Sequence, residues 1–332
     1  MNHSGSTAAT RQTERLAPDP GGIERAVEIL ARGGLVAFPT ETVYGLGADA
    51  TNPEAVARIF AAKERPRFNP LIAHLPSTEA ARREGVFDQN ADRLAAGFWP
   101  GALTLVAPAS PACSVCDLAR AGLDSVALRR PRHRVAQDLL ARFGRPVVAP
   151  SANRSGGVSP TMAEHVVADL DGRIDAVLDD GMTIVGVEST IVACLDDTPR
   201  LLRPGGIPRA DVEAALGRAL GVGPSDAARP RAPGMLASHY APRAKVRLDV
   251  LRLEPGDAVL LFGASKPQGL EHAIASRNLS ARGDLTEAAH RFFHSMRALD
   301  ETGARAIAVV PIPDEGLGEA INDRLRRAAE ER

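Results

Sequence analysis

The sequence predicts an α/β protein with a larger domain followed by a smaller one. Its 332 residues exceed what one hydrophobic core usually organises. Short apolar runs alternate with amphipathic segments of helical length over residues 18–220, and the alternation returns over residues 244–332. Residues 221–243 are dense in Pro, Gly, Ser and Ala, which is typical of a linker. Residues 1–17 lack a hydrophobic segment, so we expect a disordered tail.

Local patterns predict each element of the larger domain. Apolar runs bounded by Pro, Gly or polar residues predict strands over residues 35–38, 71–75, 103–107, 125–129, 146–150, 176–178 and 188–193. Amphipathic stretches predict helices over residues 23–31, 53–62, 79–96, 133–143, 161–170 and 211–220. Asn52 and Thr161 are suitable N-cap residues, and Pro53 suits a first helical position. The sum is a twisted, mixed sheet covered by helices.

The smaller domain has a Rossmann-like alternation without the glycine fingerprint of a dinucleotide site. Its predicted strands are residues 245–250, 258–262 and 306–310, and its predicted helices are residues 285–299 and 317–329. We therefore expect a compact α/β domain beyond the linker.

The central stretch of the larger domain has features of an anion site. Residues 40–47, TETVYGLG, are rich in hydroxyls, and we expect Gly45 and Gly47 to let the backbone bend tightly there. The next helix delivers Lys63 and Arg65 at its end, in a chain where 3 of 40 basic residues are lysines. A lysine beside an arginine suggests a compact charge next to a planar one, suited to phosphate. A basic helix end that complements the helix dipole explains the same residues equally well.

Several common motifs are missing. Residues 45–50, GLGADA, fit a dinucleotide pattern, but residues 40–44 separate them from the strand and no acidic residue closes the next strand. The chain contains no Gly-Lys pair, G-x-S-x-G or H-E-x-x-H, which disfavours a P-loop ATPase, an α/β-hydrolase and a zinc protease. Cys113 and Cys116 have redox or zinc spacing, but they lack a second ligand pair and the βα context of a thioredoxin site, and Cys194 is isolated. We expect incidental thiols in a reducing cytoplasm.

Composition narrows the possible partners. The net charge of −1 gives no electrostatic footprint for tight nonspecific nucleic-acid binding. No apolar run approaches the ~20 residues needed to cross a bilayer, and the N-terminus does not have the pattern of a secretory signal. What remains is a dispersed set of anion and hydroxyl binders, each of which could singly be a capping, core or surface residue. They are Lys63, Arg65, Asn69, His74, Ser125, Arg129, Ser151, Asn153, Ser189 and Arg203.

Three motifs together carry a family resemblance. Residues 39–47 read PTETVYGLG, residues 63–71 read KERPRFNPL, and residues 99–104 read WPGALT. With these motifs the chain resembles the YrdC-like family of threonylcarbamoyl-AMP synthases. The resemblance spans roughly residues 21–208, and the linker string SHYAP at residues 238–242 with the following domain resembles the family's long form.

The resemblance implies two neighbouring binding sites. Its L-threonine contacts would be Thr42, His74, Arg129, Ala149 and Ser189. Its ATP contacts would be Arg65, Asn69, Ser125, Ser151, Asn153, Ser159 and Arg203, with Lys63 close to the phosphates. Lys63 and Arg65 would be the catalytic cations, and Tyr240 on the linker would close over the nucleotide as a lid.

The activity implied by the resemblance is synthesis of L-threonylcarbamoyl adenylate from L-threonine, bicarbonate and ATP, with release of pyrophosphate and water. Mg²⁺ would enter with ATP, held by phosphates and water rather than by a protein metal site. The product would pass to a tRNA threonylcarbamoyl transferase complex, and tRNA binding by this chain would be weak or indirect. Two alternatives stay open: an RNA-binding module, suggested by the many arginines, and carbamoyl transfer from carbamoyl phosphate.

Overall fold

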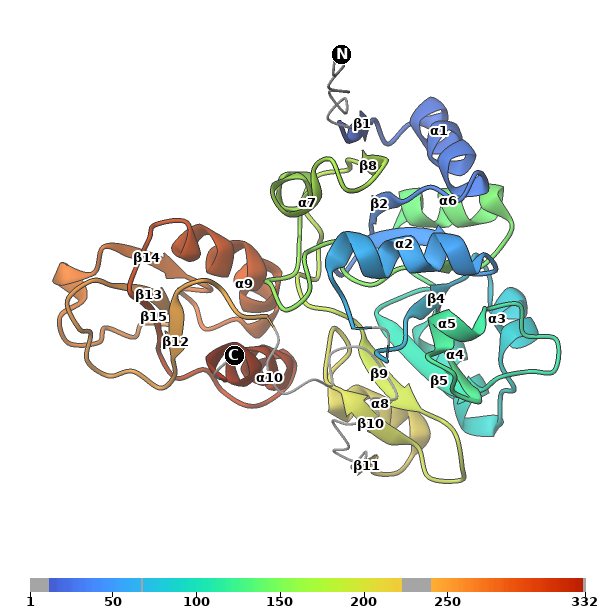
Figure 1. The fold of residues 1–332 in the computed structure, drawn as a ribbon. Coiled ribbons are helices and arrows are strands. Elements are labelled where there is room, and N and C mark those ends of the chain that lie inside the picture. The colour runs from blue at the N-terminus through green and yellow to red at the C-terminus, as the bar shows by residue number, and fades with distance from the viewer. Residues whose placement is uncertain (1–11, 67, 223–239, 331–332) are drawn as a thin grey trace, which may run out of the picture.

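The structure is a computed structural model that describes residues 12–66, 68–222 and 240–330. Figure 1 shows two α/β bodies, with the smaller C-terminal one at the left of the view. The larger body has an 11-stranded sheet and the smaller a four-stranded one. The predicted fold class, a mixed sheet with covering helices followed by a smaller α/β domain, is confirmed.

Parallel and antiparallel pairings alternate irregularly across the large sheet, so it is mixed. For example, β4 runs parallel to β6 and antiparallel to β7. In spatial order the strands are β1 (Glu14–Leu16), β8 (Ala176–Leu178), β2 (Val36–Pro39), β3 (Tyr44–Asp49), β7 (Val147–Val148), β4 (Ile72–His74), β6 (Ser125–Arg129), β5 (Leu103–Pro108), β9 (Thr190–Ala193), β10 (Arg200–Arg203) and β11 (Gly221–Val222).

Helices cover both faces of this sheet. The helices of the larger domain are α1 (Pro20–Ala31), α2 (Pro53–Lys63), α3 (Thr78–Glu84), α4 (Gln89–Phe98), α5 (Asp117–Arg120), α6 (Arg134–Phe143), α7 (Ala163–Leu170) and α8 (Arg209–Leu216). The apolar faces of α1 and α6 share one core with Val36 and Phe38, whereas α2, α4 and α7 share another with Leu35 and Ala37. Alternate residues of β2 therefore face opposite cores, as a buried strand requires.

The smaller domain has a parallel sheet in the order β12 (Lys245–Arg247), β15 (Ala306–Val309), β13 (Asp257–Leu261) and β14 (Ala275–Asn278). A 3₁₀ turn spans Leu270–His272, and the helices are α9 (Leu285–Asp300) and α10 (Leu317–Ala329). Both helices bury one apolar face against the sheet, in a core that includes Phe292, Ile307 and Ile321. The sequence missed β14, whose four residues are part-exposed or exposed and carry no continuous apolar run.

Several expectations about local structure are wrong. Residues 79–96 were expected to form one helix, but they form two, α3 and α4, with residues 85–88 between them. Residues 14–16 were assigned to a disordered tail, but they form β1, which pairs with β8 at the edge of the large sheet. Thr161 was expected to cap a helix, yet α7 begins two residues later, after Met162, with no side-chain cap. The Thr161 N–H instead donates to the His165 ring. In contrast Asn52 caps α2 as predicted, by accepting from the N–H groups of Glu54 and Ala55.

The glycines of the TETVYGLG segment serve close packing rather than a turn. Gly45 and Gly47 lie within β3, and neither has a positive φ. A Cβ on Gly47 would lie 2.8 Å from the Phe38 ring, and one on Gly45 would lie 3.0 Å from the Ala149 methyl. Such distances are too short for carbon contacts, so glycine lets neighbouring strands and Ala149 approach β3. The bend itself falls in residues 40–43, before the strand.

The two domains pack directly against each other. The backbone at Gly186, in the segment before β9, lies so close to α9 that an added Cβ would sit 2.2 Å from the Ala289 carbonyl oxygen. The rings of His165 on α7 and His294 on α9 stack with centroids 5.5 Å apart. Contacts this tight fix where the C-terminal domain sits on the larger one.

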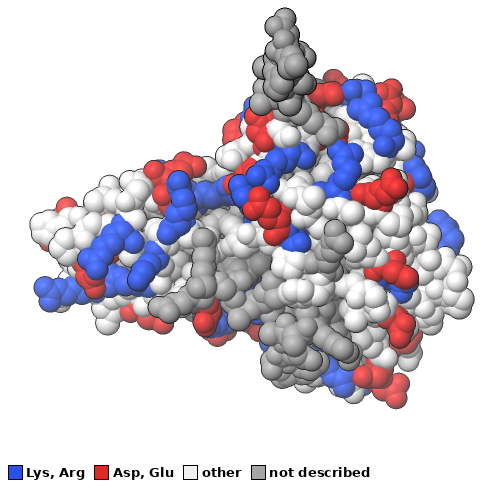
Figure 2. All heavy atoms as spheres, viewed as in Figure 1, with Lys and Arg blue, Asp and Glu red and all other residues white. Residues whose placement is uncertain are grey.

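Charges of both signs are interspersed on the face shown in Figure 2. No single-sign field dominates that face, in keeping with the net charge of −1. Within the described ranges, no helix combines the length and the apolar character that a membrane span requires.

Candidate functional site

A cavity lies where the strand ends of the larger domain meet the C-terminal domain. Its walls are made by Val43, Arg65, Ile72, His74, Arg129, Ala149, Pro150, Ser151, Glu188, Ser189, Arg203 and Tyr240. Sheet register brings these residues together, since His74 pairs with Arg129 across β4 and β6, and Ser151 bridges to Gly45. The structure therefore gathers Arg65, His74, Arg129, Ala149, Ser151, Ser189, Arg203 and Tyr240, all predicted site residues, around one space.

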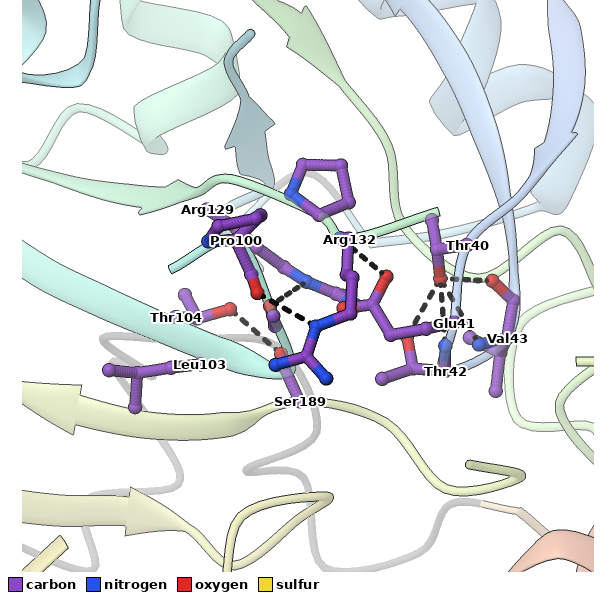
Figure 3. Close-up of polar contacts among 12 residues, drawn as sticks. Thr40, Glu41, Thr42, Val43, Pro100, Leu103, Thr104, Arg129, Arg132 and Ser189 are labelled. Atoms are coloured by element: carbon purple, nitrogen blue, oxygen red, sulfur yellow. Dashed lines mark hydrogen bonds and ion pairs between the residues drawn. The ribbon is translucent and has the colours of Figure 1, made fainter. Parts of the chain in front are cut away.

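Arg129 is held at the cavity wall by a buried ion pair. Its Nη2 lies 2.6 Å from Glu41 Oε1, and both side chains are 4% exposed (Figure 3). The other Glu41 oxygen accepts from the Arg132 N–H at 3.0 Å, and Arg129 Nε donates to the Gly101 carbonyl. Burial opposes ionisation of Glu41, but the Arg129 charge and hydrogen bonds outweigh it and hold the pKa of Glu41 below its ordinary value. Two guanidinium nitrogens are thus fixed by the protein itself.

The His74 ring is a neutral group in this wall. Its Nδ1 lies 3.1 Å from the Ile72 carbonyl oxygen, and Phe38 packs edge-on at 6.1 Å between ring centroids. Burial and the nearby Arg129 charge lower the pKa of His74 to about 3. At neutral pH the imidazole can therefore donate or accept a hydrogen bond without adding charge.

Hydroxyl groups line up behind the cavity. Thr40 Oγ1 bonds Thr42 Oγ1 at 2.8 Å and donates to the Val43 carbonyl, fixing the bend before β3 (Figure 3). Ser189 Oγ bonds Thr104 Oγ1 at 2.7 Å. Thr42 is fully buried and does not line the cavity itself, whereas Ser189 does.

Arg203 braces the same strand end. Its Nη2 and Nε both donate to the Ser189 carbonyl oxygen, at 2.9 and 3.2 Å. The side chain is 4% exposed and lines the cavity. Arg203 therefore places a buried positive charge beside Ser189.

Lys63 lies behind the cavity wall, and its predicted place near the phosphates stays a prediction. Its Nζ donates to the carbonyl oxygens of Ser151, at 2.6 Å, and of Asn153, and the side chain is 1% exposed. Burial and the Arg65 charge lower the pKa of Lys63 well below its ordinary value. Lys63 does not line the cavity; it lies behind the 151–153 turn and fixes the backbone there.

Arg65 and Asn69 carry buried polar atoms that the described part of the chain does not satisfy. Arg65 Nη2 makes two long contacts, 3.5 and 3.4 Å, to the carbonyls of Asn69 and Pro70, while its Nε has no partner there. Both polar atoms of the Asn69 amide, and Asn153 Oδ1, are likewise unpartnered. Buried polar groups are normally hydrogen-bonded, so this cluster indicates a ligand position. Burial lowers the pKa of Arg65 to about 10, and the group stays charged at neutral pH.

Two further predicted residues lie outside the cavity wall. The parallel register of β4 and β6 pairs Ile72 with Ala127, which puts Ser125 level with Pro70, beside the Arg65 contacts. Ser159 is fully buried and donates to Glu188 Oε1 at 2.6 Å. Ser159 therefore adjoins a lining residue.

Sequence reasoning missed two glutamates of the site and the distant arginine that pairs with one of them. Glu188 lines the cavity, Glu41 holds Arg129, and Arg324 of α10 reaches Glu188 from the other domain. Glu41 stands inside the TETVYGLG segment, where a carboxylate followed by a distant Arg could have suggested a pair. Arg324 sits in an arginine-rich helical string that nothing in the sequence separates from a solvated helix face.

Tyr240 closes one side of the cavity. Its ring stacks on Phe293 of α9 at 5.7 Å between centroids, and the next residue, Ala241, donates its N–H to the Gly156 carbonyl. The side chain is 2% exposed. The expected lid over residues 221–243 lies mostly outside the described residues, which leaves Tyr240 as its described contribution to the site.

The cavity walls suit an anionic ligand better than a free metal ion. Arg65, Arg129 and Arg203 converge there, and the lining carboxylate, Glu188, is engaged by Ser159 and Arg324. The described ranges contain no group of three or more His, Cys, Asp or Glu side chains that could hold a metal. Cys113, Cys116 and Cys194 are free thiols.

Comparison with known proteins gives consistent matches over both domains. A family model described as "Telomere recombination" (Sua5_yciO_yrdC) matches residues 28–205, and one described as "Threonylcarbamoyl-AMP synthase, C-terminal domain" matches residues 207–330. The Threonylcarbamoyl-AMP synthase of Bacillus subtilis is 41% identical over 331 residues, covering 96% of this chain and 95% of that protein. The Threonylcarbamoyl-AMP synthase of Pyrococcus abyssi is 41% identical over 328 residues, covering 92% of this chain and 94% of that protein.

A solved structure matches the whole arrangement. The crystal structure of P. abyssi Sua5 complexed with L-threonine superposes with a TM-score of 0.86 at 37% identity, covering 96% of this chain and 97% of that one. The two-domain arrangement is thus shared with a protein crystallised with L-threonine.

Proposed function

The chain belongs to the threonylcarbamoyl-AMP synthase family in its long form, and on that premise we propose that it makes L-threonylcarbamoyl adenylate from L-threonine, bicarbonate and ATP. The observation that carries the proposal is the convergence of Arg65, Arg129, Arg203 and His74 on one cavity closed by Tyr240. Cations and hydroxyls that are dispersed in the sequence thereby form one site, which suits an anionic nucleotide and a zwitterionic amino acid.

Threonine would bind at the end of the cavity near β6. Arg129 has Nε and Nη2 fixed by Gly101 and Glu41, and Nη1 would donate to the threonine carboxylate. The neutral His74 ring and Ser189 would bond the amino acid's other polar groups, with Ala149 in the wall and Thr42 supporting the bend behind it. A pre-fixed guanidinium binds a carboxylate with little further ordering.

ATP would occupy the end where buried polar atoms lack partners. Arg65 Nε, both Asn69 amide atoms and Asn153 Oδ1 are the groups that a nucleotide would satisfy. Arg65 and Arg203 would oppose the phosphate charge, Ser125, Ser151 and Ser159 would serve the same side, and Tyr240 would close over it. Mg²⁺ would be held by phosphate oxygens and water, since the nearby carboxylate of Glu188 is already paired.

The chemistry needs positioned charges rather than a protein nucleophile. The threonine amine condenses with bicarbonate to a carbamate and water, and a carbamate oxygen attacks the α-phosphorus as pyrophosphate leaves. Arg65 and Arg203 stabilise the negative charge that develops on the phosphates. Lys63 acts from behind by fixing the 151–153 turn, which holds Ser151 at the cavity.

The product would serve tRNA modification. We propose that a separate tRNA threonylcarbamoyl transferase complex takes the adenylate in the cytoplasm, and that this chain binds tRNA weakly or indirectly. Interspersed surface charge and a net charge of −1 support the last point.

Pyrophosphate release from ATP tests the proposal directly. We expect release that depends on both L-threonine and bicarbonate. Release that needs no threonine, or activity that requires carbamoyl phosphate in place of bicarbonate, would refute the assignment. Tight RNA binding without any pyrophosphate release would favour an RNA-binding module instead.

A further inference from the structure

The C-terminal domain sends one charged side chain into the larger domain, next to the cavity. Arg324 of α10 is 0% exposed and is the largest side chain among those that the described structure buries completely. Its Nε lies 3.0 Å from Glu188 Oε2 and its Nη1 lies 2.6 Å from the Pro204 carbonyl oxygen. Its Nη1 also pairs with Asp323 Oδ2 of the same helix at 3.0 Å. A buried guanidinium is costly unless it is paired, so the two partners in the larger domain must be held in place for Arg324 to remain there.

The two partners in the larger domain line the candidate site or directly adjoin a residue that does. Glu188 lines the cavity, and Pro204 directly follows Arg203, which also lines it. The Arg324 guanidinium carbon lies 5.4 Å from the centre of the Tyr240 ring, a cation–π distance. One side chain thus contacts three separate segments of the wall, although it does not line the cavity.

A second interdomain ion pair on α10 does not have this connection. Arg209 of α8 pairs with Glu319 of α10, and their side chains are 37% and 22% exposed. Neither lines the cavity. Helix α10 therefore takes part in two different pairs. Glu319 helps to dock the domain, whereas Arg324 contacts the wall of the site.

We propose that Arg324 is a positioning residue for adenylate synthesis, through which the docked C-terminal domain orders the nucleotide side of the site. The proposal rests on the function proposed above. Arg324 holds the Glu188 carboxylate, which in turn accepts the Ser159 hydroxyl, and it packs on the Tyr240 ring. Without Arg324, the buried Glu188 carboxylate would face Arg203 as its remaining strong counter-charge and draw that guanidinium away from the Ser189 carbonyl.

The test compares Arg324→Met with Arg209→Met in the full chain. We expect Arg324→Met to raise the KM for ATP by about ten-fold, with a smaller change in the KM for threonine, because the affected groups lie on the nucleotide side. Arg209→Met removes an interdomain pair from the larger domain's side and should leave both KM values near wild type.

A pH profile separates positioning from general destabilisation. In the intact protein burial raises the pKa of Glu188, but the charges of Arg324 and Arg203 and the Ser159 hydroxyl outweigh it and bring the pKa to about 2. Asp323 of α10 and the Tyr240 hydroxyl also face this cluster. Removing Arg324 lets the pKa of Glu188 rise, so Arg324→Met should lose more activity than the wild type on the acid side. The double variant with Glu188→Gln lacks the carboxylate whose pKa rises and should lose that acid limb, whereas Asp323 stays in both variants.

The remaining outcomes are decisive in either direction. Wild-type KM for ATP and an unchanged acid side in Arg324→Met would overturn the proposal, as would equal effects in Arg209→Met. If Arg324→Met does not fold, Arg324→Lys and Glu188→Gln replace it, and wild-type ATP kinetics in both would overturn it. Should the wild type release no pyrophosphate, the proposed function fails, and calorimetric ATP binding by the same variants still tests Arg324.

Discussion

The buried pair of Glu41 and Arg129 gives the sharpest quantitative prediction. Replacing Glu41 with Gln removes the charge opposite a guanidinium that is 4% exposed. At an effective dielectric constant of ~20, unit charges ~4 Å apart attract by about 4 kcal/mol. Breaking one side of a buried pair commonly costs about 3–5 kcal/mol. We therefore expect Glu41→Gln to lower the free energy of unfolding by roughly that amount, and to weaken threonine binding because Arg129 loses its anchor.

Chemical denaturation followed by tryptophan fluorescence is the suitable assay. Trp99 is the chain's single tryptophan, and it lies in the larger domain two residues before Gly101, whose carbonyl accepts from Arg129. The signal therefore reports unfolding of the domain that contains the pair. Asp138→Asn is the matched control, since its pair with Arg134 has side chains 44% and 64% exposed and should contribute at most about 1 kcal/mol.

The pH dependence of this difference has a definite sign. The pKa of Glu41 is lowered in the folded protein, so its stabilisation is fully present above the ordinary carboxyl pKa and is lost as the pH falls through the folded value. The gap between wild type and Glu41→Gln should be constant from about pH 6 to 8 and narrow in acid. A Glu41→Gln variant no less stable than Asp138→Asn at neutral pH would refute the reasoning.

Three further predictions concern the cavity. Lys63→Met should lower the free energy of unfolding by about 1–3 kcal/mol, because two buried carbonyls lose their donor. Denaturant titration measures this change, and an unchanged midpoint would contradict the positioning role. Arg65→Ala should nearly abolish pyrophosphate release and shift the melting temperature little, since its two protein contacts are long; retained release would remove Arg65 from the phosphate site. The KM for threonine should show no step from His74 between pH 5 and 8, because its pKa is about 3, and a step there that vanishes in His74→Asn would show the ring titrating.

Periodic elements of the fold could be predicted from sequence because local patterns determine them. Helix α2 begins at Pro53 after an Asn52 cap, and α9 and α10 follow the expected apolar spacing. Strands without such patterns were missed. Residues 14–16 read as tail because three residues, two of them charged, carry no strand signal until β8 pairs with them.

The sequence identified many residues of the candidate site but not how their side chains are arranged. Arg65, His74 and Arg129 were found as candidates. Sheet register pairs His74 with Arg129, and the end of α2 brings Arg65 to the same cavity. The sequence could not show that the Lys63 ammonium faces the 151–153 turn instead of the cavity, because that depends on how α2 packs against the loop after β7. Gly45 and Gly47 were assigned to a turn for a similar reason: glycine marks both sharp bends and close approaches.

Distance along the chain explains why Glu188 and Arg324 escaped notice. Single residues 136 positions apart form a buried pair across two domains, and neither belongs to a motif that the chemistry of phosphate or amino-acid binding would single out. A carboxylate in a predicted strand beside a nucleotide site even argues against phosphate, until its counter-charge is known. In the folded protein that counter-charge comes from the last helix, so the electrostatics of the larger domain's cavity are complete only with the C-terminal domain in place. The C-terminal domain contributes little to the cavity lining. Through this pair, its docking nevertheless sets the charge balance on which nucleotide binding depends.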